Sequence, residues 1–527
     1  MLDWSLPYPS RRQPVLARNV VATSQPLAAQ AGASMIARGG NAVDAAVAAA
    51  ITLTVVEPVS NGIGSDLFAI VWDGRELVGL NASGRAPAAA SVSRYAGKSE
   101  MPQRGWEPVT VPGAVSGWVA LSQRFGKLPF ADLFEPAIRY AREGWIVSPT
   151  IAGQWERAVG VLPHDLGFAE HFLPQGRAPR PGETFACPQQ ARTLETIAST
   201  KGEAFYRGAL AQAMAADAKR HGAVHTAEDF ARHQADWVVP LGFDYRGTTV
   251  HQIPPNGQGI AALIALGILE SFDLASEPPD SLAAQHRAIE AMKLAFADVY
   301  HYVGDPAHMR VSPEGLLDRG YLASRAKLID PKRAQDFGPG RPPSGGTVYL
   351  AAGDAGGTMV SLIQSNYMGF GSGVVVPGTG ISLQNRGAGF TLEPGHANVL
   401  AGGKRPYHTI IPGFLTRGGA PLAAFGVMGG PIQPQGHVQA LIRFLDRGMN
   451  PQAALDAPRW RWNREGTLDL EPSMDATVQR GLAALGHRLV QSDDSYMDFG
   501  AGQFVARLGS GYLAASDHRR DGQAVGF

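Results

Sequence analysis

Cysteine is almost absent from this sequence, because Cys187 is the only one in 527 residues. A single cysteine excludes an intramolecular disulfide, and it leaves a cysteine-based zinc or iron–sulfur site without ligands. A lone cysteine followed by Pro188 and Gln189 is a weak candidate nucleophile. We therefore interpret Cys187 as structural.

The chain also lacks an excess of charge of either sign. Its 46 Lys and Arg residues balance 46 Asp and Glu residues, for a formal net charge of +0 at pH 7. Proteins that bind nucleic acid or acidic membranes normally carry a positive field, so we expect neither as a partner. With 45% hydrophobic and 17% charged residues, the chain can form a large core.

Long hydrophobic runs are missing as well. The longest apolar stretch, residues 42–56, is too short to span a bilayer and contains Asp44. Residues 1–12 include no apolar segment of the kind found in signal peptides. These absences predict a cytoplasmic location.

The usual catalytic and nucleotide-binding motifs are absent too. The chain contains no G-x-x-x-x-G-K-[ST], no H-E-x-x-H and no G-x-S-x-G. Gly62-Ile-Gly64 has no third glycine in register, and the histidines show no metal-ligand spacing, so we expect no cofactor and no metal. A Ser/His/Asp triad stays open, since its members need not be close in sequence.

Hydrophobic patterning predicts a layered α/β protein. Helices are expected over residues 26–38, 41–55 and 282–303, with Asn41 capping the second. Residues 67–72 and 76–80 should form a hairpin, and residues 113–328 should be mostly helical. Strands are expected over 347–352, 358–364, 373–376, 409–415, 422–427, 503–508 and 511–515, with helices over 434–447 and 475–485.

The junction near residue 347 is the most distinctive feature. Residues 331–346 contain four prolines and four glycines, which predicts an exposed linker that runs into a strand. Cleavage of the Gly346–Thr347 bond would make Thr347 an N-terminal residue, with its own α-amine (pKa about 8) as base for its hydroxyl. Gly346 has no Cβ and would let the hydroxyl approach the preceding carbonyl. An ordinary linker before a strand is the alternative interpretation.

A series of short motifs resembles the γ-glutamyltranspeptidase family, and it runs in the family's order from about residue 17 to the C-terminus. Each motif is weak alone, whereas their shared order together with the junction threonine is specific. The motifs are Asn41-Ala-Val-Asp-Ala-Ala-Val-Ala, Val56-Glu57-Pro58, Gly62-Ile-Gly64, Val111-Pro-Gly113, Thr347-Val-Tyr-Leu, Gly369-Phe-Gly-Ser-Gly373, Gly378-Thr-Gly380, Leu383-Gln-Asn385, Lys404-Arg-Pro406 and Gly429-Gly430.

The resemblance implies an αββα sandwich of the N-terminal nucleophile hydrolase type. It implies self-cleavage into a heavy chain, residues 1–346, and a light chain, residues 347–527, that stay intertwined as one domain and that could pair further into a homodimer of the heterodimer. Thr347 would first cut the chain and then attack a substrate amide. The resulting acyl-enzyme would be resolved by water or by an acceptor amine.

Other site residues also follow from the resemblance. Ser365 falls where the family keeps a second hydroxyl residue that hydrogen-bonds the nucleophile. Gly429 and Gly430 fall where the family forms an oxyanion hole from backbone N–H groups. Their plainer interpretations are a polar residue at a strand end and a turn that enters a helix.

The substrate pocket departs from the family at the positions that hold a γ-glutamyl ammonium. Arg386 replaces a Glu or Gln, Gly389 replaces an Asp, and Tyr367 falls at an Asn contact. A guanidinium at position 386 would repel an ammonium group. The plainer interpretation of Arg386 is a surface residue near a glycine-rich loop.

The carboxylate-binding positions differ as well. His408-Thr409 stand in place of a Ser-Ser pair, and Ser83 occupies the place of an Arg, with Arg85 two residues further on. Together with Arg386, these residues offer positive charge and hydrogen-bond donors and nothing anionic. Such a pocket suits an acyl group that ends in a carboxylate without an α-amino group.

We therefore expect a self-processing amidohydrolase of a small, carboxylate-bearing amide, similar to the oxamate amidohydrolase branch of the family. The bulk of Tyr367 favours the small substrate over a glutaryl group. A γ-glutamyltransferase or glutathione hydrolase is the first alternative. A glutaryl-type cephalosporin acylase and an uncleaved, non-catalytic relative are the others.

Overall fold

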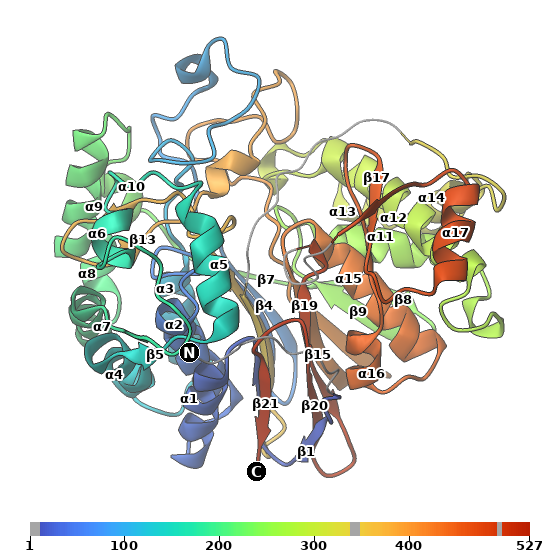
Figure 1. Ribbon diagram of the computed structural model, residues 1–527, viewed down its shortest axis with the longest axis horizontal. Helices are drawn as coiled ribbons and strands as arrows, with labels where there is room; N and C mark the ends of the chain where they lie inside the picture. Colours follow the sequence, from blue (N-terminus) through green and yellow to red (C-terminus); the bar gives the residue numbers. More distant parts are fainter. Residues whose placement is uncertain (1–10, 338–347, 493–497) are drawn as a thin grey trace.

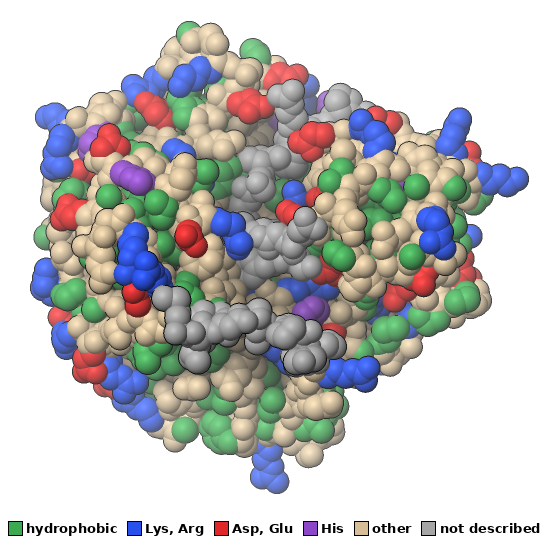
Figure 2. Space-filling model, in the orientation of Figure 1, with side chains coloured by type: hydrophobic (Ala, Val, Ile, Leu, Met, Phe, Trp, Pro, Cys, Tyr) green, Lys and Arg blue, Asp and Glu red, His purple; other side chains and the backbone are tan. Residues whose placement is uncertain are grey.

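The computed structural model describes residues 11–337, 348–492 and 498–527. Within these residues the chain forms a mixture of helices and sheets, including two seven-stranded sheets. Figure 1 shows the strands of both sheets in the centre, with one group of helices on the left and another on the right. Figure 2 shows acidic and basic side chains interspersed over one face, in line with the balanced charge.

The first sheet is antiparallel and carries the strand that follows residue 347. Its hairpin of β3 and β4 pairs Leu67 with Ala82 and Trp72 with Leu77, which confirms the predicted hairpin. In spatial order the strands are β21 (Gln523–Gly526), β2 (Val20–Thr23), β10 (Val348–Gly353), β11 (Met359–Ser365), β3 (Asp66–Trp72), β4 (Leu77–Ala82) and β7 (Asp236–Val238).

The second sheet packs face to face against the first. Phe68 and Ile363 of the first sheet share a buried cluster with Phe414 and Met428 of the second. In spatial order its strands are β1 (Val15–Ala17), β20 (Tyr512–Ser516), β19 (Ala501–Arg507), β15 (Ala420–Met428), β14 (Gly413–Arg417), β9 (Thr248–Gln252) and β8 (Leu241–Tyr245).

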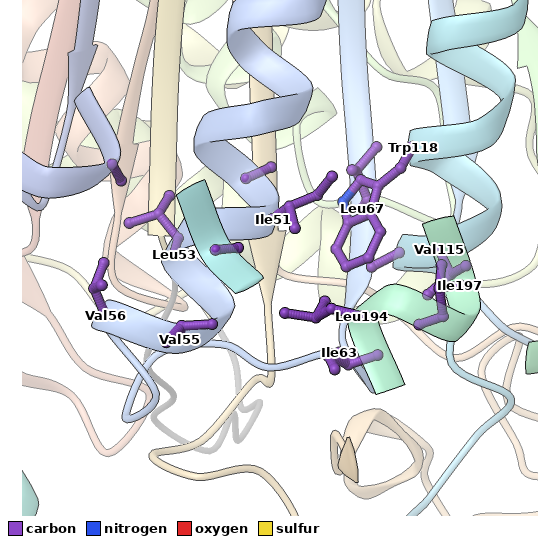
Figure 3. Packing of buried hydrophobic residues seen from close by; sticks show 14 of the residues in the cluster. Ile51, Leu53, Val55, Val56, Ile63, Leu67, Val115, Trp118, Leu194 and Ile197 are labelled. Carbon is purple, nitrogen blue, oxygen red and sulfur yellow. The ribbon is translucent and has the colours of Figure 1, made fainter. Parts of the chain in front are cut away.

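Helices of the N-terminal half cover the outer face of the first sheet. Every residue of α2 is buried, and the helix begins with the predicted Asn41 cap, in a reciprocal capping box with Asp44. Figure 3 shows Ile51 of α2 close to Leu67 of β3 and Trp118 of α3. The helices of this half are α1 (Pro26–Ala37), α2 (Ala42–Val56), α3 (Ala114–Phe125), α4 (Glu135–Glu143), α5 (Pro149–Val159), α6 (Phe168–Phe172), α7 (Pro188–Thr200), α8 (Glu203–Tyr206), α9 (Ala209–Arg220) and α10 (Ala227–Ala231).

A second group of helices covers the outer face of the other sheet. The helix predicted over 282–303 is confirmed as α12, whereas the one predicted over 434–447 ends its α-helical part at Leu441 and continues as a π-helical turn over Ile442–Asp446. This group comprises α11 (Ile260–Leu269), α12 (Leu282–Tyr302), α13 (Pro313–Leu316), α14 (Arg319–Ala326), α15 (Ile432–Leu441), α16 (Pro451–Asp456) and α17 (Ala476–Ala484).

Several strands depart from the sequence predictions. The region 113–328, predicted as mostly helical, contains β7, β8 and β9, which are only three to five residues long and so give a weak strand signal. The strand predicted over 409–415 begins only at Gly413, because the N–H of Ile411 donates to Gln433 Oε1 instead of to a neighbouring strand. Five short strands were not predicted: β5 (Trp145–Ile146) with β6 (Thr184–Phe185), and β16 (Trp460–Trp462), β17 (Thr467–Leu470) and β18 (Arg488–Gln491). The strand predicted over 373–376 is reduced to β12 (Val375–Val376), which pairs with β13 (Ile381–Ser382).

Two further sequence expectations concern Cys187 and membrane segments. Cys187 is buried, and desolvation raises the pKa of its thiol, in agreement with a structural role. Among the described helices, none is long and apolar enough to cross a membrane.

Candidate active site

The register of the first sheet brings three strand ends to one edge. Val348 at the start of β10 pairs with Gln364, and Ser365 at the end of β11 pairs with Asp66 at the start of β3. Neighbouring strands lie about 4.8 Å apart, so the start of β10 and Asp66 are about 10 Å from each other. Gly346 and Thr347 directly precede β10 in the chain and lie outside the described residues.

Asp66 is a buried carboxylate at this edge. Its Oδ1 accepts hydrogen bonds from the N–H groups of Gly84 (3.2 Å) and Gly113 (3.0 Å), and its Oδ2 lies 3.1 Å from His408 Nε2. Burial raises the pKa of Asp66 to about 7, against the opposing effect of the Arg386 charge. Asp66 corrects the expectation that the pocket contains nothing anionic. Its signal was a single acidic residue opening the apolar run 66–72.

His408 is fully buried beside Asp66. Desolvation and the positive charges of Arg386 and Arg405 lower the pKa of His408 well below its usual value, so the ring is neutral at neutral pH. A neutral ring that donates from Nε2 to Asp66 contributes no positive charge. The expectation that His408 adds to the cationic character of the pocket is therefore wrong.

Arg386 begins a single 3-10 turn, Arg386–Gly389, and is only 1% exposed. Its Nη1 donates to Thr409 Oγ1 at 2.7 Å, while Nε and Nη2 have no hydrogen-bond partner among the described residues. Burial lowers the pKa of Arg386 to about 10, so the group remains charged at neutral pH. The surface interpretation of Arg386 is wrong. A buried guanidinium with two donors unpaired is a site prepared for an anion.

Tyr367 covers this guanidinium. Its ring centroid lies 4.6 Å from Arg386 Cζ, and its backbone φ of 80° is a conformation that non-glycine residues rarely adopt. The N–H of Tyr367 donates to Ser365 Oγ at 2.8 Å. The turn after β11 thus ties the backbone of Tyr367 to the hydroxyl of Ser365.

Gly429 and Gly430 form the turn between β15 and α15. Both have positive φ, 129° and 69°, which only glycine adopts readily. Gln258 Nε2 donates to the carbonyl of Gly430 at 2.9 Å and to that of Thr409 at 2.7 Å. Gln258 therefore links the glycine turn to the segment that carries His408 and Thr409.

Arg85 makes its contacts elsewhere. Its side chain is 47% exposed, and Nη1 lies 3.2 Å from both Asp305 Oδ2 and the carbonyl of Gly403. The structure therefore brings together six residues at or beside the sheet edge and leaves Arg85 paired with an acidic partner outside that group. The six residues, called the edge cluster below, are Asp66, Ser365, Tyr367, Arg386, His408 and Thr409.

A cavity of about 440 Å³ opens on the outer side of Tyr367 and Gly389. Aromatic rings and charged groups line it, among them Tyr300, Tyr407 and Arg464. A second cavity, of about 710 Å³, shares Tyr300 and Arg464 with the first. The first cavity has room for a substrate group far larger than ammonia.

A group of side chains with metal-ligand spacing lies within the described residues but outside the edge cluster. It consists of His286 and Glu290 on α12 together with His487. His286 Nδ1 lies 2.8 Å from His487 Nε2, and Lys293 Nζ lies 2.7 Å from Glu290 Oε1. Because the Lys293 ammonium already supplies the positive charge that Glu290 requires, this group is satisfied without a metal ion.

The close approach around Asp66 gives a stability prediction. An alanine at Gly113 would place its Cβ 1.8 Å from the carbonyl oxygen of Ala82, so the backbone that donates to Asp66 would have to move. We expect Gly113→Ala to lower the free energy of unfolding by about 3 kcal/mol or more, which exceeds the usual effect of overpacking a core. The soluble yield and the melting temperature should fall with it. Gly153→Ala in α5 is the control, because no atom lies within 4 Å of its added Cβ. Equal melting temperatures for the two variants would contradict this account.

Comparison with known proteins identifies the family. The protein-family model described as gamma-glutamyltranspeptidase matches residues 28–527. This chain belongs to that family. It is 37% identical over 520 residues to the glutathione hydrolase-like YwrD proenzyme of Bacillus subtilis (97% of this chain, 98% of the relative) and 36% identical over 515 residues to the oxamate amidohydrolase proenzyme of Klebsiella pneumoniae (95% and 97%). The crystal structure of cephalosporin acylase from Bacillus halodurans superimposes with a TM-score of 0.95 at 48% identity, over 100% of this chain and 99% of that one.

These relatives establish the general activity. This member of the γ-glutamyltranspeptidase family is an enzyme of the N-terminal nucleophile class. It acts either as an amide hydrolase or as a γ-glutamyl hydrolase or transferase. Because the curated relatives are proenzymes, self-processing into two chains is part of that activity.

Proposed function

We propose that this protein hydrolyses an amide whose acyl group ends in a carboxylate, and that Arg386 binds that carboxylate. The observation that carries the proposal is the buried Arg386 guanidinium, with Nε and Nη2 unpaired among the described residues. A carboxylate can accept from both nitrogens at once, a geometry that an ammonium group cannot use. Thr409 holds the remaining arm of the guanidinium at 2.7 Å and Tyr367 covers its face.

The proposed mechanism begins with cleavage of the Gly346–Thr347 bond. It yields residues 1–346 and 347–527, and each sheet contains strands from both pieces, so the pieces stay intertwined in what we infer to be an αββα sandwich. Thr347 Oγ then attacks the substrate carbonyl, and the Thr347 α-amine takes the hydroxyl proton and passes it to the departing amine. Water attacks the acyl-enzyme and restores the threonine.

Two further groups assist this reaction in the proposal. The backbone N–H groups at Gly429 and Gly430 stabilise the oxyanion, a task for which the absence of side chains leaves room. Ser365 orients the nucleophile from the end of β11, next to the strand that follows Thr347.

The size of the substrate is the finer part of the proposal. A small, oxamate-like acid is favoured by the full burial of Arg386 beneath Tyr367, which leaves little depth for the acyl group. A glutaryl-type cephalosporin acylase is the second candidate. It is favoured by the cavity of about 440 Å³ beyond Tyr367, which would accept a large leaving amine, and by the likeness to the Bacillus halodurans enzyme.

The test is a substrate screen with the purified, processed protein. Ammonia release is measured for oxamate, and p-nitroaniline release is measured for the glutaryl, γ-glutamyl and pentanoyl anilides. We expect at least one of the two carboxylate-bearing substrates without an amino group to exceed the γ-glutamyl and pentanoyl anilides by about 100-fold in kcat/KM, since a charge-assisted bidentate pair contributes about 2–3 kcal/mol. Preference for the γ-glutamyl anilide would overturn the proposal.

A further inference from the structure

Asp66 and Arg386 form a separated pair of opposite charges inside the edge cluster. The Asp66 oxygens are occupied by the N–H groups of Gly84 and Gly113 and by His408 Nε2, and no ion pair joins Asp66 to Arg386 among the described residues. Among the charged groups, each nevertheless has the largest effect on the pKa of the other. The carboxylate therefore acts on the guanidinium through space, without blocking Nε or Nη2.

A negative charge near Arg386 weakens the attraction between Arg386 and any anion that binds it. Both side chains are almost completely buried, at 0% and 1% exposure, so water screens this effect poorly. A substrate carboxylate that binds Arg386 also approaches Asp66 and is repelled by it. Neutral Asp66 would leave the full positive charge available to the substrate.

Resting on the function proposed above, we propose that Asp66 determines how tightly Arg386 holds a substrate carboxylate, with weak binding while Asp66 is ionised and strong binding once Asp66 is protonated. Asp66 acts by its charge and does not touch the substrate. The carboxyl group thereby makes the affinity for acidic amides depend on pH.

The direction of this dependence follows from the groups around Asp66. The raised pKa of Asp66, about 7, makes it ionised above pH 7 and neutral below. His408, from the neighbouring segment, is neutral throughout this range because its pKa is well below its usual value. Arg386, with a pKa of about 10, stays positive, and Arg405 is the other positive charge that acts on Asp66. Burial and Asp66 raise the pKa of Tyr206, so Tyr206 stays neutral. Asp66 is thus the group in this set that changes charge between pH 6 and pH 8.

Paired inhibitors isolate this effect from the titration of the Thr347 amine. Inhibition constants are measured at pH 6, 7 and 8 for dicarboxylates of two to five carbons and for the monocarboxylates of the same length, such as glutarate with pentanoate. Both members of a pair place a carboxylate at the reacting end, so the ratio of the monocarboxylate constant to the dicarboxylate constant reports the distal carboxylate alone. For the tightest-binding pair we expect this ratio to rise at least about threefold from pH 8 to pH 6, since one charge is removed beside Arg386.

Asp66→Asn keeps the shape of the side chain and removes its charge. We expect its ratio to be independent of pH and at least as high as the wild-type ratio at pH 6. Asp298→Asn is the matched control, because it removes a buried carboxylate that pairs with Arg325 outside the edge cluster, and its pH series should match the wild type. If Asp66→Asn does not mature, the pH dependence of the wild-type ratio tests the inference: a ratio that does not change between pH 6 and pH 8 overturns it.

Failure of this inference is distinguishable from failure of the proposed function. A high ratio that Arg386→Gln abolishes, but that neither pH nor Asp66→Asn changes, overturns the role of Asp66 and leaves the role of Arg386 standing. A wild-type ratio near one at every pH, unaltered by Arg386→Gln, overturns both.

Discussion

Replacing Thr347 by alanine is expected to leave a single uncut chain of 527 residues and to abolish amide hydrolysis. In the proposed mechanism one hydroxyl both cuts the Gly346–Thr347 bond and attacks the substrate, and its base is an amine that exists only after cleavage. Loss of the nucleophile removes covalent catalysis, so the expected decrease in kcat is about 10⁴-fold or more. Intact mass and N-terminal sequencing after incubation at neutral pH measure the first effect, and the substrate screen measures the second.

Two variants control this experiment. Thr347→Ser keeps a hydroxyl and should still be processed, with a light chain that begins at Ser and continues Val-Tyr-Leu. Thr358→Ala removes a threonine just before β11 and should be cut and active like the wild type. A Thr347→Ala protein that is still cut between residues 346 and 347 would contradict every role given to Thr347.

Replacing Arg386 by glutamine is expected to raise KM for the preferred carboxylate-bearing substrate about 100-fold, while kcat/KM for the uncharged pentanoyl anilide stays within about threefold. The first change corresponds to about 2.7 kcal/mol, the loss of a charge-assisted bidentate pair. Glutamine retains an amide donor and much of the volume beneath the Tyr367 ring, which limits disturbance of the fold. Steady-state kinetics on both substrates separate lost recognition from general damage.

Arg85→Gln is the matched control for this variant. Arg85 is half-exposed and pairs with Asp305, so its loss should change KM less than about fivefold, as for other exposed ion pairs. A larger effect at Arg85 than at Arg386 would move the carboxylate site away from the edge cluster. It would support Arg85 as the principal binding residue.

Replacing Gly389 by an acidic residue is a poor way to convert the pocket to γ-glutamyl substrates. A Cβ on Gly389 would lie 2.8 Å from the carbonyl oxygen of Tyr407, closer than real Cβ atoms approach. The family's acidic residue therefore does not fit at position 389 without movement of the Tyr407 backbone. Substitution at Arg386 alone is the sharper test of charge recognition.

Much of the local structure followed directly from the sequence. The period of the apolar residues predicted α12 within one residue, and Asn41 marked the start of α2, because both signals are local in the sequence. The linker, the junction threonine and the ordered motifs identified the family, which the match over residues 28–527 confirms.

Strands with weak local signals needed the tertiary structure. β8 and β9 are only five residues long each, and they are stabilised by pairing with each other and by the pairing of β9 with β14. Pairing of this kind joins residues far apart in the chain, so no local window of sequence contains it.

The same distinction applies to the candidate site. The sequence alone determined which residue types occupy the pocket positions, and with them the change from a Glu or Gln to Arg386. Only the tertiary structure decided their charges: it buried Arg386 under Tyr367, made His408 neutral and brought Asp66, more than 300 residues earlier in the chain, to the same sheet edge. Charge and pKa depend on burial and on neighbours that folding brings together, and these neighbours are not close in sequence.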